Sequence, residues 1–222
     1  MSQHLTDQNK RSVFASGLIL FAANLLPLIA VWKHNWTCYD LLVLYWTETI
    51  LIGVINIFRM IIVNPQGSTP AFHLLKIAYI PFFAGHFGMF CVGIGLGMQV
   101  LFGEENFEVR NQIIQMLSGK SKLIFWPLVI SHIFSYCWNF IAQREFKRTS
   151  VLRRMFAPYL RVIPVMAFAV GATYGCIHLQ MVMWASFAFI GGKLLIDLLI
   201  HVIMHFKLMV RKEQRRLITV RD

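Results

Sequence analysis

Charged residues are scarce in this sequence: Asp, Glu, Lys and Arg make up 14% of its 222 residues, against about 25% in a typical soluble domain. Apolar residues make up 57%, and they gather in long runs rather than being scattered. A run of about 18 residues or more is long enough to cross a hydrocarbon core about 30 Å thick. The sequence therefore excludes an ordinary soluble domain and predicts an integral membrane protein.

Cysteine is also sparse, and the four cysteines have no Cys-x-x-Cys spacing, which excludes a zinc ribbon or a dithiol redox motif. Cys38 and Cys176 are both expected near the outer face of the membrane. One disulfide between them and four free thiols at apolar sites are therefore both open. No small-residue cleavage site follows a short apolar region near the start of the sequence, so we interpret the first apolar run as an uncleaved helix.

The apolar runs predict an all-α fold, a polytopic integral membrane bundle of about six transmembrane helices. Residues 12–206 would form this transmembrane domain, with residues 1–11 as a cytoplasmic lead and residues 207–222 as a basic cytoplasmic tail. No internal repeat or low-complexity tract indicates a second domain. The expected spans are 12–32, 40–62, 75–102, 123–141, 162–178 and 181–206.

The basic residues predict the orientation of these spans. Sixteen Lys and Arg residues fall on the side of the two chain ends and four on the other side, while Lys193 lies inside a span. Because cytoplasmic loops are enriched in Lys and Arg, both ends are expected in the cytoplasm. The net charge of +11 thus follows from topology, and we infer no nucleic-acid partner from it.

Two connections between the expected spans have a pattern of their own. Residues 103–122 combine acidic and apolar residues, and they favour a short amphipathic helix on the outer surface or a solvated connector. Residues 144–161 combine basic and apolar residues. Together with the basic tail they are candidates for binding anionic lipid at the inner leaflet, the alternative again being a solvated connector.

Ionisable residues inside the expected spans are the candidates for a functional site, because a charge in hydrocarbon costs several kcal/mol unless it is paired or hydrated. Lys193, Asp197 and His201 recur every four residues on the last span and therefore share one face. Asp197 can pair with Lys193, or it can orient His201 as a metal ligand. His205 extends the series to a His-x-x-x-His pair, a spacing that can place two imidazoles on one metal.

Three other spans carry polar residues at similar depth, and inward packing of these stripes would form a shared polar cavity. The alternative is that each side chain only makes structural hydrogen bonds or ion pairs. The predicted metal ligands are His86, His132, Asp197 and His201, with zinc as the expected ion. The predicted catalytic residues are Glu48, Ser135 and Lys193.

Several segments resemble a family of multi-pass membrane proteins from bacteria and archaea that is catalogued as a domain of unknown function. They are LYWTETILIGVINIFRM, PFFAGHFGMF, SHIFSYCWNF, APYLRV and KLLIDLLIHVIMH. The resemblance implies a membrane bundle in the plasma (bacterial inner) membrane and names no reaction. The positions that it implicates are Tyr45, Trp46, Glu48, Asn56, His86, Gly88, His132, Ser135, Asn139, Pro158, Tyr159, Arg161, Lys193, Asp197 and His201.

The sequence is also weakly similar to the membrane hydrolases that include alkaline ceramidases and adiponectin-receptor-like proteins. Those proteins hold zinc among seven transmembrane helices with Ser, His and Asp residues and a late His-x-x-x-His. The likeness implies related roles for Asp197, His201 and His205 on the last span, together with His86, His132 and Ser135. Rhomboid proteases also have six spans, but their GxSG nucleophile motif is replaced here by SHIFS.

Three functions remain open from the sequence. One is a zinc-dependent hydrolase of a lipid or amide, in which the metal lowers the pKa of a bound water to about 7 and Glu48 is the general base. Another is a small proton-coupled transporter that uses the same polar residues. The last is a non-catalytic assembly or scaffold subunit with a homo-oligomeric or protein partner.

Overall fold

The structure, a computed structural model, is helical throughout the regular part that it describes. The helices are α2 (Cys38–Ile62), α3 (Pro70–Phe102), α5 (Lys122–Ser135), the π-helix η1 (Tyr136–Ala142), the 3-10 turn η2 (Glu145–Lys147) and α6 (Val151–Leu179). Shorter helical pieces cover residues 26–33 and 190–199. The described residues are 26–33, 36, 38–65, 67–102, 111, 114, 117–119, 122–179, 187–188 and 190–199.

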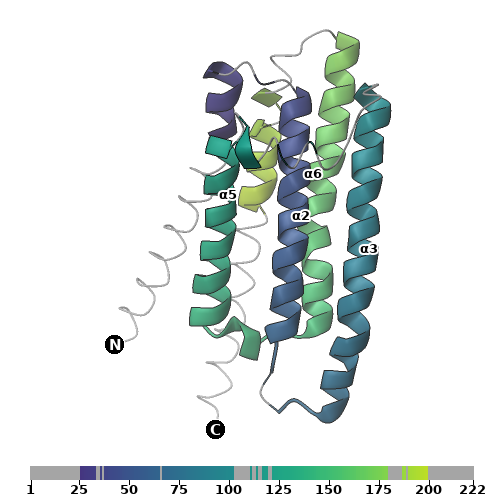
Figure 1. Ribbon diagram of the computed structural model, residues 1–222, viewed down its shortest axis with the longest axis vertical. Coiled ribbons are helices and arrows are strands. Elements are labelled where there is room, and N and C mark those ends of the chain that lie inside the picture. The colour runs from purple at the N-terminus through teal and green to yellow at the C-terminus, as the bar shows by residue number, and fades with distance from the viewer. Residues whose placement is uncertain are drawn as a thin grey trace, which may run out of the picture.

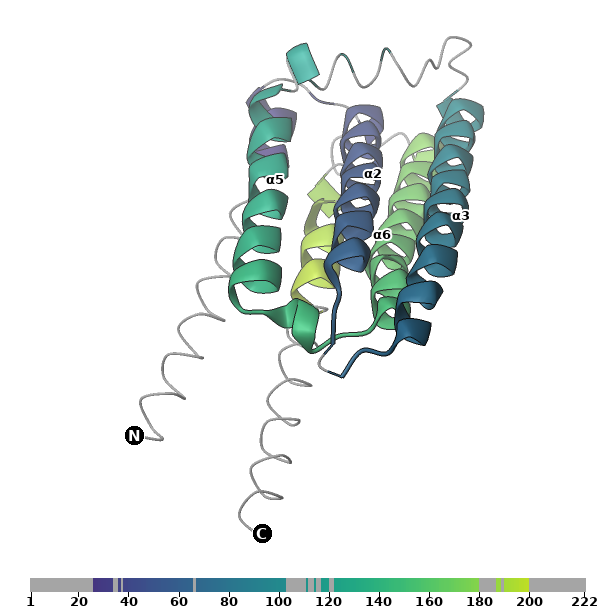
Figure 2. The same cartoon turned by 60° about the horizontal axis from the view of Figure 1, so that its bottom comes forward.

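Helix α2 is the centre of this bundle. It packs against α3, α6 and α5, and it stands between α5 and α3 in two views (Figures 1 and 2). Its apolar span is 67% buried inside the bundle, whereas that of α3 is 17% buried. Residues 41–49 are buried on every side of the helix: residues 41–46 are apolar, whereas residues 47–49 are polar. Trp46 anchors α2 to α3 by donating a hydrogen bond from its indole to the carbonyl of Cys91, at 2.8 Å.

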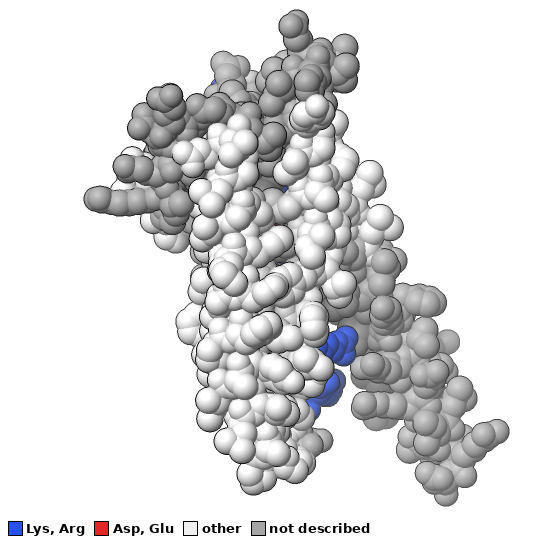
Figure 3. All heavy atoms as spheres, turned by 90° about the vertical axis from the view of Figure 1, so that its right-hand side faces the viewer, with Lys and Arg blue, Asp and Glu red and all other residues white. Residues whose placement is uncertain are grey.

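Helix α3 lies at the periphery and presents apolar side chains outward. On the side of the molecule where it lies, few Lys and Arg atoms are visible among the described residues, and most of them lie at one margin of the surface, below its middle (Figure 3). An exposed surface of this kind suits contact with lipid chains rather than with water. The large exposed apolar residues of α3 are Leu74, Leu75, Ile77, Phe82, Met89, Val92, Leu96 and Val100.

Within the described ranges, three helical segments are long and apolar enough to cross a membrane: Tyr39–Ile62, Pro70–Val100 and Lys122–Ala142. They correspond to the predicted spans 40–62, 75–102 and 123–141, and α2 and α3 end at the residues predicted. Residues 12–25, 181–186 and 200–206 and both predicted tails lie outside the described residues. Six spans and cytoplasmic chain ends therefore stay predictions.

The connection predicted at 144–161 is wrong over its second part, because α6 begins at Val151 rather than near Val162. The arginines of this segment suggested a loop, but its apolar residues already follow a helical period. Val151, Met155, Val162 and Val165 are all buried, and their spacings of three, four and seven residues place them on one face. The basic residues lie between them, and the connection shortens to about residues 143–150.

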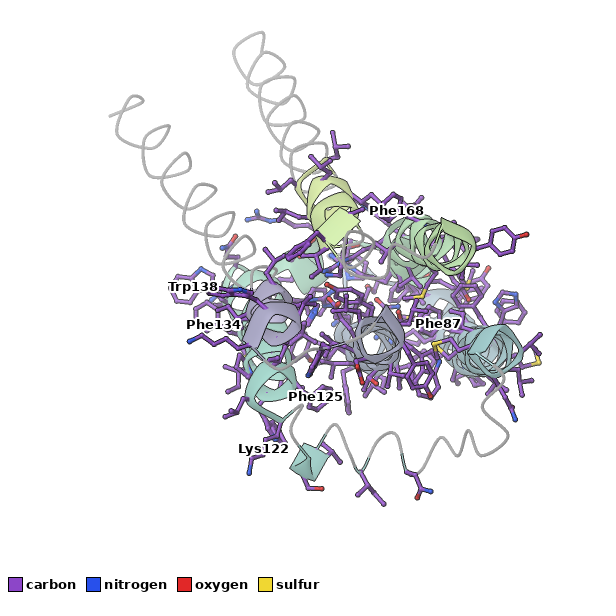
Figure 4. The ribbon with its side chains drawn as sticks, turned by 90° about the horizontal axis from the view of Figure 1, so that it is seen from above. Phe87, Lys122, Phe125, Phe134, Trp138 and Phe168 are labelled. Atoms are coloured by element: carbon purple, nitrogen blue, oxygen red, sulfur yellow. The ribbon has the colours of Figure 1, made fainter. Side chains whose placement is uncertain are left out.

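Two glycines allow helices to approach closely. A Cβ placed on Gly53 of α2 would lie 2.4 Å from the ring of Phe87 on α3, and one on Gly192 would lie 2.2 Å from the ring of Phe168 on α6. Seen from above, Phe87 lies between α2 and α3, and Phe168 lies between α6 and the 190–199 helix (Figure 4). The second contact is the one that brings residues 190–199 against α6.

We expect Gly53→Ala to destabilise the protein by about 1–3 kcal/mol, because the new methyl group overlaps a ring that is fixed by its neighbours. Phe87 is 4% exposed and stacks against Phe83. The matched control is Gly93→Ala on α3, where a Cβ meets no described atom within 4 Å. Thermal unfolding in detergent would measure both, and equal stability of the two variants would contradict the packing described.

A polar contact between α2 and α6 compensates for a proline. Pro158 has no backbone N–H, so the carbonyl of Arg154, four residues earlier, lacks its usual helical donor. The buried side chain of Asn56 donates to that carbonyl from Nδ2 at 2.9 Å. Asn56 thus supplies the missing bond and fixes how α2 and α6 sit together.

Because Asn56 supplies the donor that Pro158 lacks, the effects of substituting Asn56 and Pro158 should be coupled. Asn56→Leu should cost about 1–3 kcal/mol, because it leaves the carbonyl of Arg154 without a donor. In a Pro158→Ala background the cost should fall, since residue 158 then has an N–H of its own. A double-mutant cycle on the unfolding free energy would measure the difference. Strictly additive costs would contradict the explanation.

Candidate functional site

The carboxylate of Glu48 gathers three polar partners from three helices at the middle of the bundle. His132 of α5 donates from Nε2 to Oε1 at 3.0 Å, and Arg161 of α6 donates from Nη2 to the same oxygen at 3.1 Å. Lys193 of the 190–199 helix places its Nζ 3.2 Å from Oε2. Glu48 is 3% exposed, so these groups replace the water that the carboxylate has lost.

A second buried carboxylate, Asp197, is held by the same two cations. Arg161 donates from Nε to Oδ1 at 2.9 Å and from Nη2 to Oδ2 at 3.3 Å. Lys193 donates from Nζ to Oδ2 at 3.0 Å, across one turn of its own helix. We call the set Glu48, His132, Arg161, Lys193 and Asp197 the charge network.

The charge network is balanced. It contains two carboxylates and two cations, so its net charge is zero when His132 is neutral. Buried ions are tolerated when opposite charges and hydrogen bonds replace hydration, and removing one partner leaves an uncompensated charge. The balance explains how charged side chains persist inside helices that are otherwise apolar.

The local sequence explains the positions of Lys193 and Asp197. Lys193 and Asp197 are four residues apart and therefore share a helix face, as their spacing predicted. The preceding Gly192 lets that helix approach α6 through Phe168, which brings both residues to Arg161. The ring of Tyr45 lies 4.7 Å from the ammonium of Lys193 and adds a cation–π contact.

A small cavity lies beside the charge network, between α2 and α6. Its lining includes Glu48, Arg161 and Lys193 on the polar side and Ile52, Val162 and Val165 on the apolar side. The volume open to the centre of a water molecule is about 10 Å³, which is room for about one water. Anything larger would require the helices to separate.

The other predicted site residues have different surroundings. His86 of α3 is exposed and is hydrogen-bonded through Nδ1 to the hydroxyl of Tyr159 at 2.7 Å. Ser135 is the last residue of α5, where the α-helix passes into the π-helix. His201 lies outside the described residues. The side chains of Cys38 and Cys176 are not described, so a disulfide between them stays a prediction.

The structure therefore brings together four of the predicted residues, Glu48, His132, Lys193 and Asp197, as ion pairs and hydrogen bonds. Within the described ranges, no group of three or more His, Cys, Asp and Glu side chains could hold a metal ion. Both carboxylates are instead engaged by cations. Because His201 and His205 are not described, the zinc site and the hydrolase stay predictions, and zinc analysis of purified protein would test them.

Arg161 is the member of the network that the predicted site lacked. It was counted with the basic connection at 144–161, although the family resemblance implicated it. The signal that locates it is the buried stripe of α6, because Arg161 lies one residue before the buried Val162 and three after Pro158. A helix extended back to Val151 would have placed it at the depth of Glu48.

These features define the class of protein: a helical bundle with segments apolar enough to cross a membrane, closed around a buried charge network. The chain belongs to a family of unknown function (DUF6498), whose model matches residues 6–214. This confirms the predicted resemblance to a family of unknown function. Comparisons with curated proteins and with solved structures find no match.

We expect Glu48→Gln or Lys193→Met alone to destabilise the protein by about 3–5 kcal/mol, because each leaves a buried charge unbalanced. The double variant restores a net charge of zero and should lose less than the sum of the two. Arg153→Gln, at an exposed arginine of α6, is the control and should change little. Additive losses, measured by unfolding in detergent, would show that charge balance is not what the network provides.

Proposed function

We propose that this protein is a proton-coupled carrier of a small polar solute, and that the charge network is its coupling site. The observation that carries the proposal is that Arg161 and Lys193 each contact both carboxylates. A cation that contacts two carboxylates can strengthen its ion pair with one while it weakens its ion pair with the other, so it is never left unpaired. Such shared pairing allows helices to move relative to one another at a low electrostatic cost.

The protonatable group is the pair of Glu48 and His132. Their neighbours are Arg161 from α6 and Lys193 from the 190–199 helix, so the pair titrates within a set whose charges otherwise cancel. A proton added there gives the network one excess positive charge in a low-dielectric interior. That excess favours a compensating movement of charge or solute, which is the physical basis of coupling.

The helices around the network have the irregularities that such movement requires. Helix α6 contains Pro158 and Pro164, which remove two backbone donors from its interior. Helix α5 passes into a π-helix directly after Ser135, one turn from His132. Carriers commonly place their sites at interrupted helices near the middle of the membrane.

Proteoliposomes loaded with a pH-sensitive dye test the proposal. Addition of one class in a panel of amino acids, sugars, short carboxylates and amines should acidify the lumen for the wild type and not for Glu48→Gln. Arg153→Gln, which leaves the charge network intact, should retain the response. If no solute of the panel acidifies the lumen when the wild-type protein is correctly folded, the proposal of a carrier is overturned.

A scaffold subunit is the second candidate, favoured by the saturation of the network. Each of the four carboxylate oxygens of Glu48 and Asp197 has a cationic partner, which suits a permanent clamp between helices. A scaffold predicts that the network variants lose stability in proportion to charge imbalance and that no solute moves protons. The proteoliposome and unfolding measurements together separate the two.

A further inference from the structure

Two arginines meet at the end of the bundle where α2 ends and α6 begins, away from the charge network. Arg59 lies in the last turn of α2 and Arg154 in the first turn of α6. Both guanidinium groups lie over the ring of Phe140 in the π-helix, with their central carbons 5.9 and 4.9 Å from its centroid. Because both positive charges face the same ring, they repel each other.

This arginine pair has unused donors. The Nε atoms of both Arg59 and Arg154 are buried and have no hydrogen-bond partner among the described residues. Arg154 is 8% exposed as a whole, so water does not readily substitute. Thr149 precedes Arg154 by five residues, and its hydroxyl is also buried without a hydrogen-bond partner in the described part of the chain. Buried polar atoms are rarely left without a hydrogen-bond partner. A buried donor that has no partner within the protein is often one that binds an ion or a water.

The pair is also unbalanced in charge. Glu145 is the acidic partner, and it contacts Nη2 of Arg154 from a half-exposed position. Among the described residues, two guanidinium groups face one carboxylate, which leaves an excess positive charge in a largely buried place. The charge network, in contrast, has as many carboxylates as cations. An anion from outside the described part of the chain would compensate this excess positive charge.

The surface around the arginine pair is also basic and therefore also favours anions. Residues 144–154 contain five basic side chains and one acidic one, and Arg144, Lys147, Arg148 and Arg153 are exposed. Exposed apolar residues begin on α6 at the same level, at Leu152 and Phe156. Basic side chains directly beside an apolar face are typical of the headgroup region of a membrane.

We propose that Arg59 and Arg154 bind a phosphate group, supplied by an anionic phospholipid headgroup or by a free phosphate compound. Phosphate suits the pair because it offers several acceptor oxygens around one centre, so two guanidinium groups on different helices can donate to it at once. A carboxylate offers only two oxygens, whereas phosphate offers more acceptor positions for two forks that come from different helices. Binding would also link the end of α2 to the start of α6.

The test is ligand-induced thermal stabilisation of the full chain in maltoside detergent. The probes are inorganic phosphate, with sodium chloride at equal ionic strength, and short-chain phosphatidylglycerol, with short-chain phosphatidylcholine. We expect stabilisation by phosphatidylglycerol, by phosphate or by both, beyond that given by chloride and phosphatidylcholine. A shift with phosphatidylglycerol alone identifies the lipid as the source, and an equal shift with phosphate identifies the free group.

Substitutions show whether the arginine pair is responsible. Arg59→Met should weaken the apparent affinity by about tenfold to a hundredfold, the loss expected for one charged hydrogen bond. Arg153→Met makes the same charge change at an exposed arginine one residue from Arg154 and should weaken it much less. Each variant is compared with its own ligand-free midpoint, so a general loss of stability does not imitate a loss of binding. Equal losses in both variants, or no shift with any probe, would overturn the proposal.

Discussion

A charge placed in hydrocarbon costs about 3 kcal/mol or more, and this cost governs how the described helices pack. Glu48 and Asp197 are buried acids on helices far apart in the sequence, and Arg161 and Lys193 are the cations that compensate them. None of the four can face lipid unpaired. Their mutual pairing therefore selects the arrangement in which α2, α6 and the 190–199 helix surround one point, with α5 adding His132.

Steric and backbone constraints then determine how closely these helices approach. Gly53 and Gly192 remove side chains where Phe87 and Phe168 need space. Asn56 replaces the backbone donor that Pro158 lacks, at a distance of 2.9 Å from the freed carbonyl. These contacts involve no ionic charge, but they hold the ion pairs at hydrogen-bonding distance, because a shift of about one ångström would separate donors from acceptors.

The two polar regions of the protein differ in charge balance, and that difference separates their proposed roles. The charge network pairs each carboxylate oxygen within the chain, so its behaviour depends on protons and on exchange between partners. Within the described part of the chain, the arginine pair at the end of the bundle has one carboxylate for two guanidinium groups and two Nε atoms without acceptors. The first is suited to coupling inside the bundle, and the second to holding an anion at its edge.

Local sequence was enough to predict the apolar spans 40–62, 75–102 and 123–141, because a run long enough to cross a membrane is a local property. It also placed Lys193 and Asp197 on one face, since spacing along a helix fixes the face. The packing of distant helices was needed to show that Arg161 pairs with Glu48 and that His86 pairs with Tyr159. The reason is that helix neighbours and rotations depend on contacts between segments far apart in the chain, and no local pattern encodes them.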